Sequence, residues 1–252
     1  MCGICGEVAL LGRKKPDPVT IKEIASRLAH RGPDDEGYFS EANVSFGHRR
    51  LSIIDIEKSR QPMVSDDKSA VLVFNGEIYN YTELRTELET LGFSFRSSGD
   101  TEVLLKAYLA WKDKMLPKLN GMFAFVIYDF RDNTMLMARD RFGQKPLVYC
   151  QTDNGMLFSS ELKPLLLHPA VKRTLDKKGC LEYLMFQNVM PSETIIEGIK
   201  KMPAAHALTY DASSGRTKMF RYYSPVFDTN NDLPGAPSDS DLDALEDVLV
   251  SS

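Results

Sequence analysis

The sequence predicts an α+β fold whose strands are mostly antiparallel. Three observations support this: short apolar, strand-like runs recur along the chain, polar or Gly/Asn turns separate most of them, and amphipathic helices lie among them. The segments Asp132-Asn133 and Asp153-Asn154-Gly155 are such turns. Turns of this kind favour antiparallel hairpins, because parallel strands need long crossovers. Helices mixed with antiparallel strands are typical of the α+β class.

The first expected strand begins beside the N-terminus, as an apolar run from Gly3 to Leu11. The other strand-like runs share a high content of β-branched, aromatic and long apolar residues. They cover residues 44–48, 51–56, 70–74, 122–129, 135–139, 147–150, 156–160 and 205–210.

Amphipathic spacing predicts the helices. One lies between Asp17 and Gly32, with Pro18 in its first turn and Ile21, Ile24, Ala25 and Leu28 on one face. A second follows Asn80-Tyr81-Thr82-Glu83, which resembles a capping box, and ends at Gly92. A third opens at Asp100 and carries apolar residues to Trp111, and a short fourth starts near Asp176.

Composition sets limits on location and partners. The chain has 252 residues, is 43% hydrophobic and 26% charged, and carries a formal net charge of −4. We therefore expect no nucleic-acid partner, since no strong basic field is present. No apolar run approaches the ~18–20 residues of a membrane span, and the N-terminus does not resemble a signal peptide. Four cysteines without a framework spacing fit a reducing compartment, so we expect a cytoplasmic protein.

The chain changes character near residue 224. Residues 224–238 are expected to form a linker, because the stretch from Thr229 to Ser238 is rich in Asn, Pro, Gly and Ser. Beyond it, Leu242, Leu245 and Leu249 mark one face of a helix with nothing obvious to bury against. We expect residues 239–252 to be the truncated start of a further domain.

The second residue is the most informative single position. Removal of Met1 would leave Cys2 with a thiol of pKa about 8.5 and an α-amine of pKa about 7.7–8.0 on one residue. An N-terminal nucleophile of this kind carries its own general base. Cys2 and Cys5 also form a C-x-x-C, which suits a redox pair or half of a zinc site. On a strand their side chains point to opposite faces, so we expect Cys5 to be a small buried residue and no metal to be bound.

Several short motifs follow Cys2 along the chain and add to the evidence for a catalytic site. They are His30-Arg31-Gly32-Pro33-Asp34, His48 to Asp55 (HRRLSIID), Phe74 to Tyr81 (FNGEIYNY), Ser98 to Glu102 (SGDTE), Leu119 to Phe125 (LNGMFAF), Ala138 to Gly143 (ARDRFG) and Ser159 to Lys163 (SSELK). In this order, behind Met1-Cys2-Gly3-Ile4, they closely resemble the glutaminase domain of glutamine-hydrolysing asparagine synthetases. That domain is a class II glutamine amidotransferase of the N-terminal nucleophile hydrolase superfamily.

The resemblance implies a fold and a set of roles. It covers residues 2–223 and implies a four-layer αββα sandwich of two antiparallel sheets. Cys2 would be the nucleophile, and Arg50 would hold the α-carboxylate of glutamine in a bidentate fork. The remaining roles are an oxyanion hole from Asn75 and Gly76, a backbone wall around Leu51, Ile53 and Asp55, and an ammonium site from Glu77 and Asp100. Arg31 and Met122 match positions near an ammonia route, and His30 and His48 are interpreted as structural.

Each motif has a simpler interpretation. Asn75-Gly76 is a common hairpin turn, Asp100 would cap the helix it opens, and Arg50 would form a surface ion pair. Their occurrence together behind Cys2 favours catalysis.

The resemblance implies hydrolysis of glutamine to glutamate and ammonia through a thioester, with ammonia passed to a C-terminal synthetase domain that makes asparagine from aspartate. ATP and magnesium would belong to that domain, and no cofactor is expected on this chain. Amidation of another carboxylate and a non-catalytic glutamine-binding module are the alternatives, and a homodimer is left open.

Overall fold

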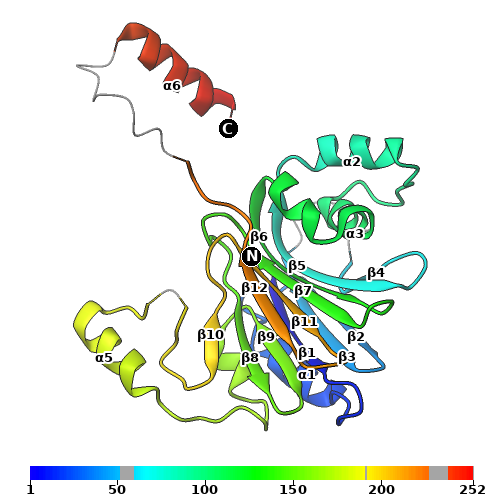
Figure 1. Ribbon diagram of the computed structural model, residues 1–252, viewed down its shortest axis with the longest axis vertical. Helices are drawn as coiled ribbons and strands as arrows, with labels where there is room; N and C mark the ends of the chain where they lie inside the picture. The colour runs from blue at the N-terminus through cyan, green and yellow to red at the C-terminus, as the bar shows by residue number, and fades with distance from the viewer. Residues whose placement is uncertain (52–59, 191, 227–237, 252) are drawn as a thin grey trace.

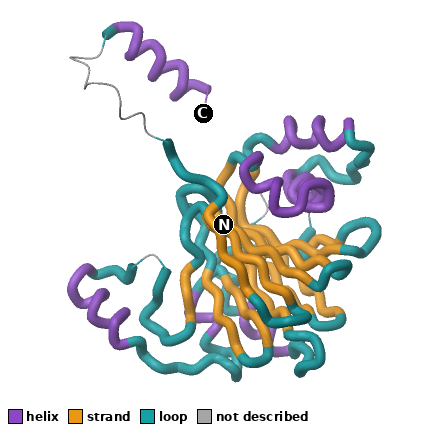
Figure 2. The backbone as a smooth tube through the Cα atoms, in the orientation of Figure 1, coloured by secondary structure: helices purple, strands orange, loops and turns teal. Residues whose placement is uncertain are grey.

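The computed structural model describes residues 1–51, 60–190, 192–226 and 238–251. Two antiparallel sheets form its centre, and Figures 1 and 2 show them stacked face to face. One sheet has the strand order β10-β8-β9-β1-β3-β2, and the other has the order β12-β11-β7-β6-β5-β4. The strands of the first sheet are β1 (Gly3–Ala9), β2 (Asp35–Glu41), β3 (Val44–Arg50), β8 (Val148–Thr152), β9 (Gly155–Ser159) and β10 (Ile199–Lys201). The strands of the second are β4 (Met63–Val64), β5 (Ala70–Ile78), β6 (Gly121–Asp129), β7 (Thr134–Arg139), β11 (His206–Asp211) and β12 (Thr217–Arg221).

Four of the six described helices, α1 to α4, pack on the outer faces of the two sheets. The helices are α1 (Pro18–Ser26), α2 (Tyr81–Thr90), α3 (Asp100–Trp111), α4 (Leu162–Leu165), α5 (Lys177–Phe186) and α6 (Asp239–Ser251), with a 3₁₀ segment at Lys112–Lys118. Ile21 and Ile24 of α1 pack on Cys5 of β1, while Leu104 of α3 packs with Phe74 of β5. The order helix–sheet–sheet–helix confirms the predicted α+β sandwich.

Central strands are buried on both faces, which explains their almost continuous apolar sequence. Side chains alternate along β5, so that Leu72 and Phe74 face α2 and α3, whereas Val71 and Val73 face the other sheet. Ile4 of β1 joins Val71 and Val73 in the layer between the sheets. The N-terminus is thereby fixed between the two sheets, next to β3 and β5.

Some local expectations differ from the structure. Asn75-Gly76 lies inside β5, paired with β6, and does not form a hairpin turn. Asn80 occupies the N-cap of α2, but its side chain makes no capping bond. Its amide instead donates to Lys118 O at 2.9 Å and accepts from Asn120 N at 2.9 Å, so the capping-box prediction is wrong. The expected strand at 51–56 lies mostly outside the described residues.

The C-terminal helix is separate from this core. The helix predicted beyond the linker is present as α6, and its residues from Asp239 to Val250 are exposed. Among the described helices, none combines the length and apolar character that a membrane-spanning segment requires.

Candidate active site

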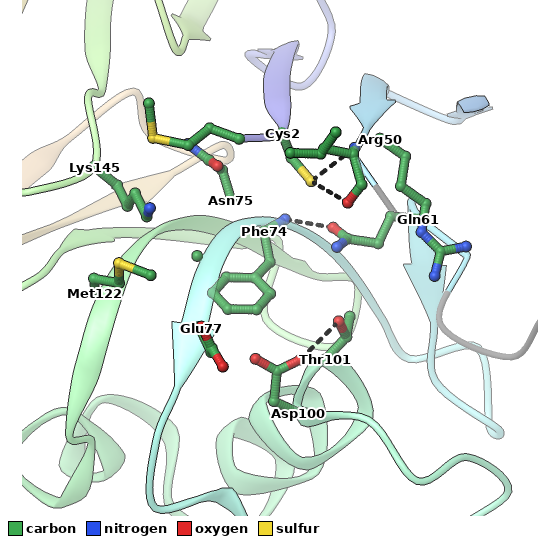
Figure 3. A pocket seen from close by; sticks show the side chains of 13 residues that line it. Cys2, Arg50, Gln61, Phe74, Asn75, Glu77, Asp100, Thr101, Met122 and Lys145 are labelled. Atoms are coloured by element: carbon green, nitrogen blue, oxygen red, sulfur yellow. Dashed lines mark hydrogen bonds between the residues drawn. The ribbon is translucent and has the colours of Figure 1, made fainter. Parts of the chain in front are cut away.

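One pocket collects every predicted site residue that the structure describes. Cys2, Arg50, Leu51, Asn75, Gly76, Glu77 and Asp100 all line it (Figure 3), and Ile53 and Asp55 lie outside the described residues. Arg50 is only 6% exposed, so it is not the side chain of a surface ion pair. The sequence therefore predicted which residues meet, although they are up to 98 positions apart between Cys2 and Asp100.

The two sheets supply opposite walls of the pocket. Gly3 pairs with Arg49 across β1 and β3, which places Cys2 beside the end of β3 and its last residue, Arg50. The other wall comes from β5, which carries Asn75, Gly76 and Glu77, and from Asp100 at the first position of α3.

The sulfur of Cys2 contacts the backbone of Leu51. The Leu51 N–H donates to Cys2 Sγ at 3.4 Å, and the thiol lies 3.8 Å from Leu51 O. Burial raises the pKa of the Cys2 thiol, while the Leu51 N–H, the Met1 amine, Arg50 and Lys145 lower it in part. A thiol with a raised pKa needs a nearby base to become a nucleophile.

Asn75 presents an amide without a partner. The side chain is 1% exposed, and within the described residues Nδ2 has no hydrogen-bond acceptor. Buried donors are almost always paired, so an unpaired one inside a pocket suits an oxyanion that is present only during a reaction.

The backbone of Gly76 completes this donor pair. On the edge of β5 that faces away from β6, the Phe74 N–H donates to Gln61 Oε1 at 2.6 Å and the Ile78 N–H donates to Asp100 Oδ2 at 3.0 Å. Because N–H groups alternate along a strand, the Gly76 N–H points to the same edge, between these two. A Cβ at Gly76 would lie 2.2 Å from Met122 O and 2.7 Å from Phe123 Cα, so no larger residue fits there.

Glu77 and Asp100 form an acidic end of the pocket. Asp100 is 7% exposed, and burial together with the nearby charge of Glu77 raises the pKa of its carboxyl. Asp100 does not act as the N-cap of α3, because Gly99 occupies that position. Two carboxylates this close are suited to a cation, which would relieve their repulsion.

Arg31 holds the backbone of the nucleophile. Its Nε donates to Cys2 O at 3.0 Å, and its Nη1 contacts Glu161 Oε1 at 3.0 Å. His30 Nε2 lies 2.9 Å from the same oxygen of Glu161.

His48 is buried, and its burial lowers the pKa of the ring to about 4. Neither histidine lines the pocket.

The C-x-x-C residues point in different directions, as expected for a strand. Cys5 Sγ lies 3.7 Å from Gly47 O and 3.9 Å from Ile21 O, on the α1 side of the sheet, whereas Cys2 faces the pocket. Both cysteines are free.

The pocket also contains residues that the sequence did not indicate. Gln61 and Lys145 line it from irregular segments. Phe74 and Thr101 also line it, and they stand in motifs named above, where the resemblance gave them no role. Lys145 stands two residues after the motif that ends at Gly143, which was the one available signal.

Comparison with known proteins identifies the family. Residues 1–223 match the model of the glutamine amidotransferase domain. The chain is 38% identical over 235 residues to "Asparagine synthetase [glutamine-hydrolyzing] 3" of Bacillus subtilis, covering 92% of this chain and 38% of that protein. It is 41% identical over 211 residues to "Asparagine synthetase [glutamine-hydrolyzing] 1" of the same organism, covering 83% of this chain and 33% of that protein. The chain thus spans little more than a third of the length of these relatives.

A solved structure supports the fold. Glutamine phosphoribosylpyrophosphate amidotransferase from Bacillus subtilis superposes with a TM-score of 0.65 at 19% identity, covering 89% of this chain and 50% of that one. This likeness confirms the N-terminal nucleophile hydrolase fold. With the match over residues 1–223, the chain belongs to the glutamine amidotransferase family, in the group whose relatives are asparagine synthetases.

Proposed function

We propose that this chain is the glutaminase part of an asparagine synthetase, in which Cys2 hydrolyses glutamine and the ammonia passes to a C-terminal synthetase domain. The observation that carries this proposal is that Cys2 lines one pocket with Arg50, Asp100 and Asn75, whose Nδ2 has no acceptor among the described residues.

The pocket charges fit free glutamine in one orientation. Arg50 pairs with the α-carboxylate through a two-pronged, charge-assisted contact, while Glu77 and Asp100 bind the α-ammonium group. Backbone groups around Leu51 complete the wall. The side-chain amide then extends toward Cys2, with its oxygen on Asn75 Nδ2 and the Gly76 N–H. A peptide-bound glutamine lacks both terminal charges and is rejected.

The reaction proceeds in two halves. The Cys2 amine, directly or through a water, takes the thiol proton, and the sulfur forms a bond to the amide carbon while the carbonyl electrons move onto oxygen. Asn75 and Gly76 stabilise this oxyanion. The C–N bond breaks as the protonated amine returns its proton to the leaving ammonia. Water then hydrolyses the γ-glutamyl thioester, which releases glutamate and regenerates the thiol.

This mechanism requires removal of Met1. Met1 is 54% exposed and lines the pocket, and while it is attached the nitrogen of Cys2 is an amide without basicity. Processing frees the base and the space beside the sulfur.

The second half of the function rests on the relatives. We assign residues 2–223 to the glutaminase domain, 224–238 to a linker and 239–252 to the start of the synthetase domain, where ATP and magnesium would act on aspartate. The exposed apolar residues of α6, Leu242, Leu245 and Leu249, support a partner for that helix.

Glutamate release tests the proposal. Processed protein is incubated with glutamine beside Cys2→Ala, and glutamate is measured. Turnover that the variant abolishes supports a glutaminase, whereas glutamine binding without turnover in the processed wild type supports a binding module. A chain extended through the synthetase region, given ATP and aspartate, identifies the acceptor: failure with aspartate and success with another carboxylate overturns the asparagine assignment.

A further inference from the structure

Lys145 is a largely buried lysine that lines the pocket, and its ammonium has no partner among the described residues. Its side chain lines the pocket with Cys2 and Asn75, and the residue is 7% exposed. Within the part of the chain that the structure describes, its Nζ makes no hydrogen bond or salt bridge. An ammonium group at the wall of a partly enclosed pocket acts strongly on any negative charge that forms beside it, because little water screens the interaction.

The backbone around Lys145 is fixed on both sides. Its N–H donates to Asp140 Oδ2 at 3.0 Å, and its carbonyl accepts from Arg139 Nε at 2.6 Å. Asp140 also accepts from the backbone of Gln144 and Phe142, which orders the turn between β7 and β8. These hydrogen bonds fix the backbone of the turn, and the turn directs the Lys145 side chain into the pocket.

The charges of the pocket can be compared with those of a bound glutamine. Glutamine brings one carboxylate and one ammonium group, which match Arg50 and the acidic pair Glu77 and Asp100. Its side-chain amide is neutral. Figure 3 shows the Lys145 nitrogen on the side of Asn75 and Met122, away from Asp100. Lys145 therefore has no counter-charge in the bound substrate, and gains one only when negative charge develops during the reaction.

We propose that the Lys145 ammonium is an electrostatic stabiliser of the negative charge that forms on Cys2 Sγ and then on the amide oxygen. This inference rests on the proposed glutaminase function and adds a third positive element to Asn75 and Gly76. The proton path does not pass through Lys145: the thiol proton moves to the Cys2 amine and from there to ammonia. An interaction made only with the transition state raises kcat and leaves KM unchanged.

The other charges around Cys2 define what Lys145 contributes. Burial raises the pKa of the Cys2 thiol, whereas Arg50, Lys145 and, in this Met1-containing form, the Met1 amine lower it in part. Arg31 contacts the Cys2 carbonyl, and Glu77 and Asp100 lie on the far wall. Arg50 will be neutralised by the substrate carboxylate, so Lys145 remains as the side-chain cation available to the sulfur in the complex.

The test titrates the thiol directly. The rate of Cys2 alkylation by iodoacetamide is followed against pH in processed wild type, Lys145→Met and Lys145→Arg, with Cys2→Ala giving the background from other cysteines. Lys218→Met, which removes an exposed lysine of β12, is the matched control. We expect the midpoint to rise by about one pH unit in Lys145→Met, to stay near wild type in Lys145→Arg, and to be unchanged in the control.

Glutamine turnover provides the second readout. Lys145→Met should lower kcat by about tenfold or more with KM unchanged, and Lys145→Arg should recover most of it. An unshifted midpoint in Lys145→Met, or a raised KM with unchanged kcat, overturns the inference. Thermal unfolding verifies folding, and Lys145→Gln serves as a second neutral variant. If wild type fails to hydrolyse glutamine, the proposed function fails, while the alkylation titration still decides whether Lys145 acts on the sulfur.

Discussion

The Leu51 N–H donates to Cys2 Sγ across 3.4 Å, which links the nucleophile to the residue that follows β3. Arg50, directly before Leu51, lines the same pocket. The position of the sulfur and the position of the Arg50 guanidinium are therefore set by one strand end. This relationship explains how Cys2 and Arg50, 48 positions apart in sequence, come to line one pocket.

Asn75 gives a prediction that separates catalysis from stability. Asn75→Leu should lower kcat about 10²–10³-fold, because it removes one oxyanion donor. It should leave the melting temperature unchanged or raised, since Nδ2 has no partner to lose among the described residues. Steady-state kinetics and calorimetry measure the two effects.

Asn43→Leu is the matched control for Asn75. Asn43 Nδ2 donates to Ala9 O at 2.8 Å and its Oδ1 accepts from Tyr128 at 3.2 Å, both away from the pocket. This variant should lose stability by about 1–3 kcal/mol with kcat retained. The same pattern in both variants would contradict the assigned role of Asn75.

Arg50→Lys should weaken glutamine binding. A lysine ammonium cannot reproduce a two-pronged contact with a carboxylate, so we expect KM to rise by roughly 10–100-fold, corresponding to about 1.5–3 kcal/mol. Arg49→Lys is the control, because Arg49 pairs with Glu36 at 2.6 Å outside the pocket. Equal KM values for Arg50→Lys and wild type would exclude Arg50 as the carboxylate partner.

The Asp100 carboxylate is expected to lower the stability of the fold and to increase the affinity for glutamine. Its folded-state pKa is raised, so the folded protein binds the proton more tightly and loses stability as pH rises through the Asp100 titration. At neutral pH, Asp100→Asn should raise the melting temperature and also raise KM, because a charge that binds the ammonium group is lost. In wild type, affinity for glutamine should increase with pH over the same range, and in Asp100→Asn it should not.

Glu102, on the same helix, shows the opposite pKa shift, so its charge stabilises the fold where that of Asp100 destabilises it. Although burial opposes it, hydrogen bonds from Lys106 and Ser97 lower the pKa of Glu102 to about 2. Its stabilising effect is present above the unfolded-state pKa and is lost as pH falls toward 2. Glu102→Gln should therefore destabilise the protein at neutral pH by about 3 kcal/mol, since the buried Lys106 Nζ loses its carboxylate partner at 2.7 Å and keeps only Ser94 O and the more distant Asp66. Melting temperatures that shift in the same direction for both variants would refute this account.

Gly76→Ala should damage both the fold and the site. The added Cβ would lie 2.2 Å from the backbone oxygen of Met122, so the pairing of β5 with β6 must shift. We expect a loss of about 1–3 kcal/mol in the free energy of unfolding, measured by chemical denaturation, together with lower kcat. A variant with wild-type kcat would show that the Gly76 N–H is not needed at its present position.

The sequence predicted the central strands because they are buried on both faces. Val71 to Phe74 and Phe123 to Tyr128 are continuous apolar runs, and β5 and β6 contain them. β2 was missed because Asp35–Glu41 is a half-exposed edge strand with little apolar alternation. β12 was missed for the same reason, since Thr217–Arg221 is mostly exposed.

Motifs that occur in a fixed order along the chain predicted some of the pocket residues, and the other pocket residues could not be predicted from the sequence. Cys2, Arg50, Asn75 and Asp100 stand in segments whose joint order carries the family resemblance, and the pocket brings them together. Gln61 and Lys145 are single polar residues in irregular segments, where no periodicity reports a side-chain direction. Only the fold shows that they reach the nucleophile.

The most direct test of the account compares two forms of the same chain, one with Met1 removed and one with Met1 retained, each verified by intact mass. Glutamate release is measured for both at equal concentration. The account predicts turnover by the processed form alone, because only there does Cys2 carry a free amine. Equal turnover by the form that retains Met1 would contradict the central claim that Cys2 is its own general base.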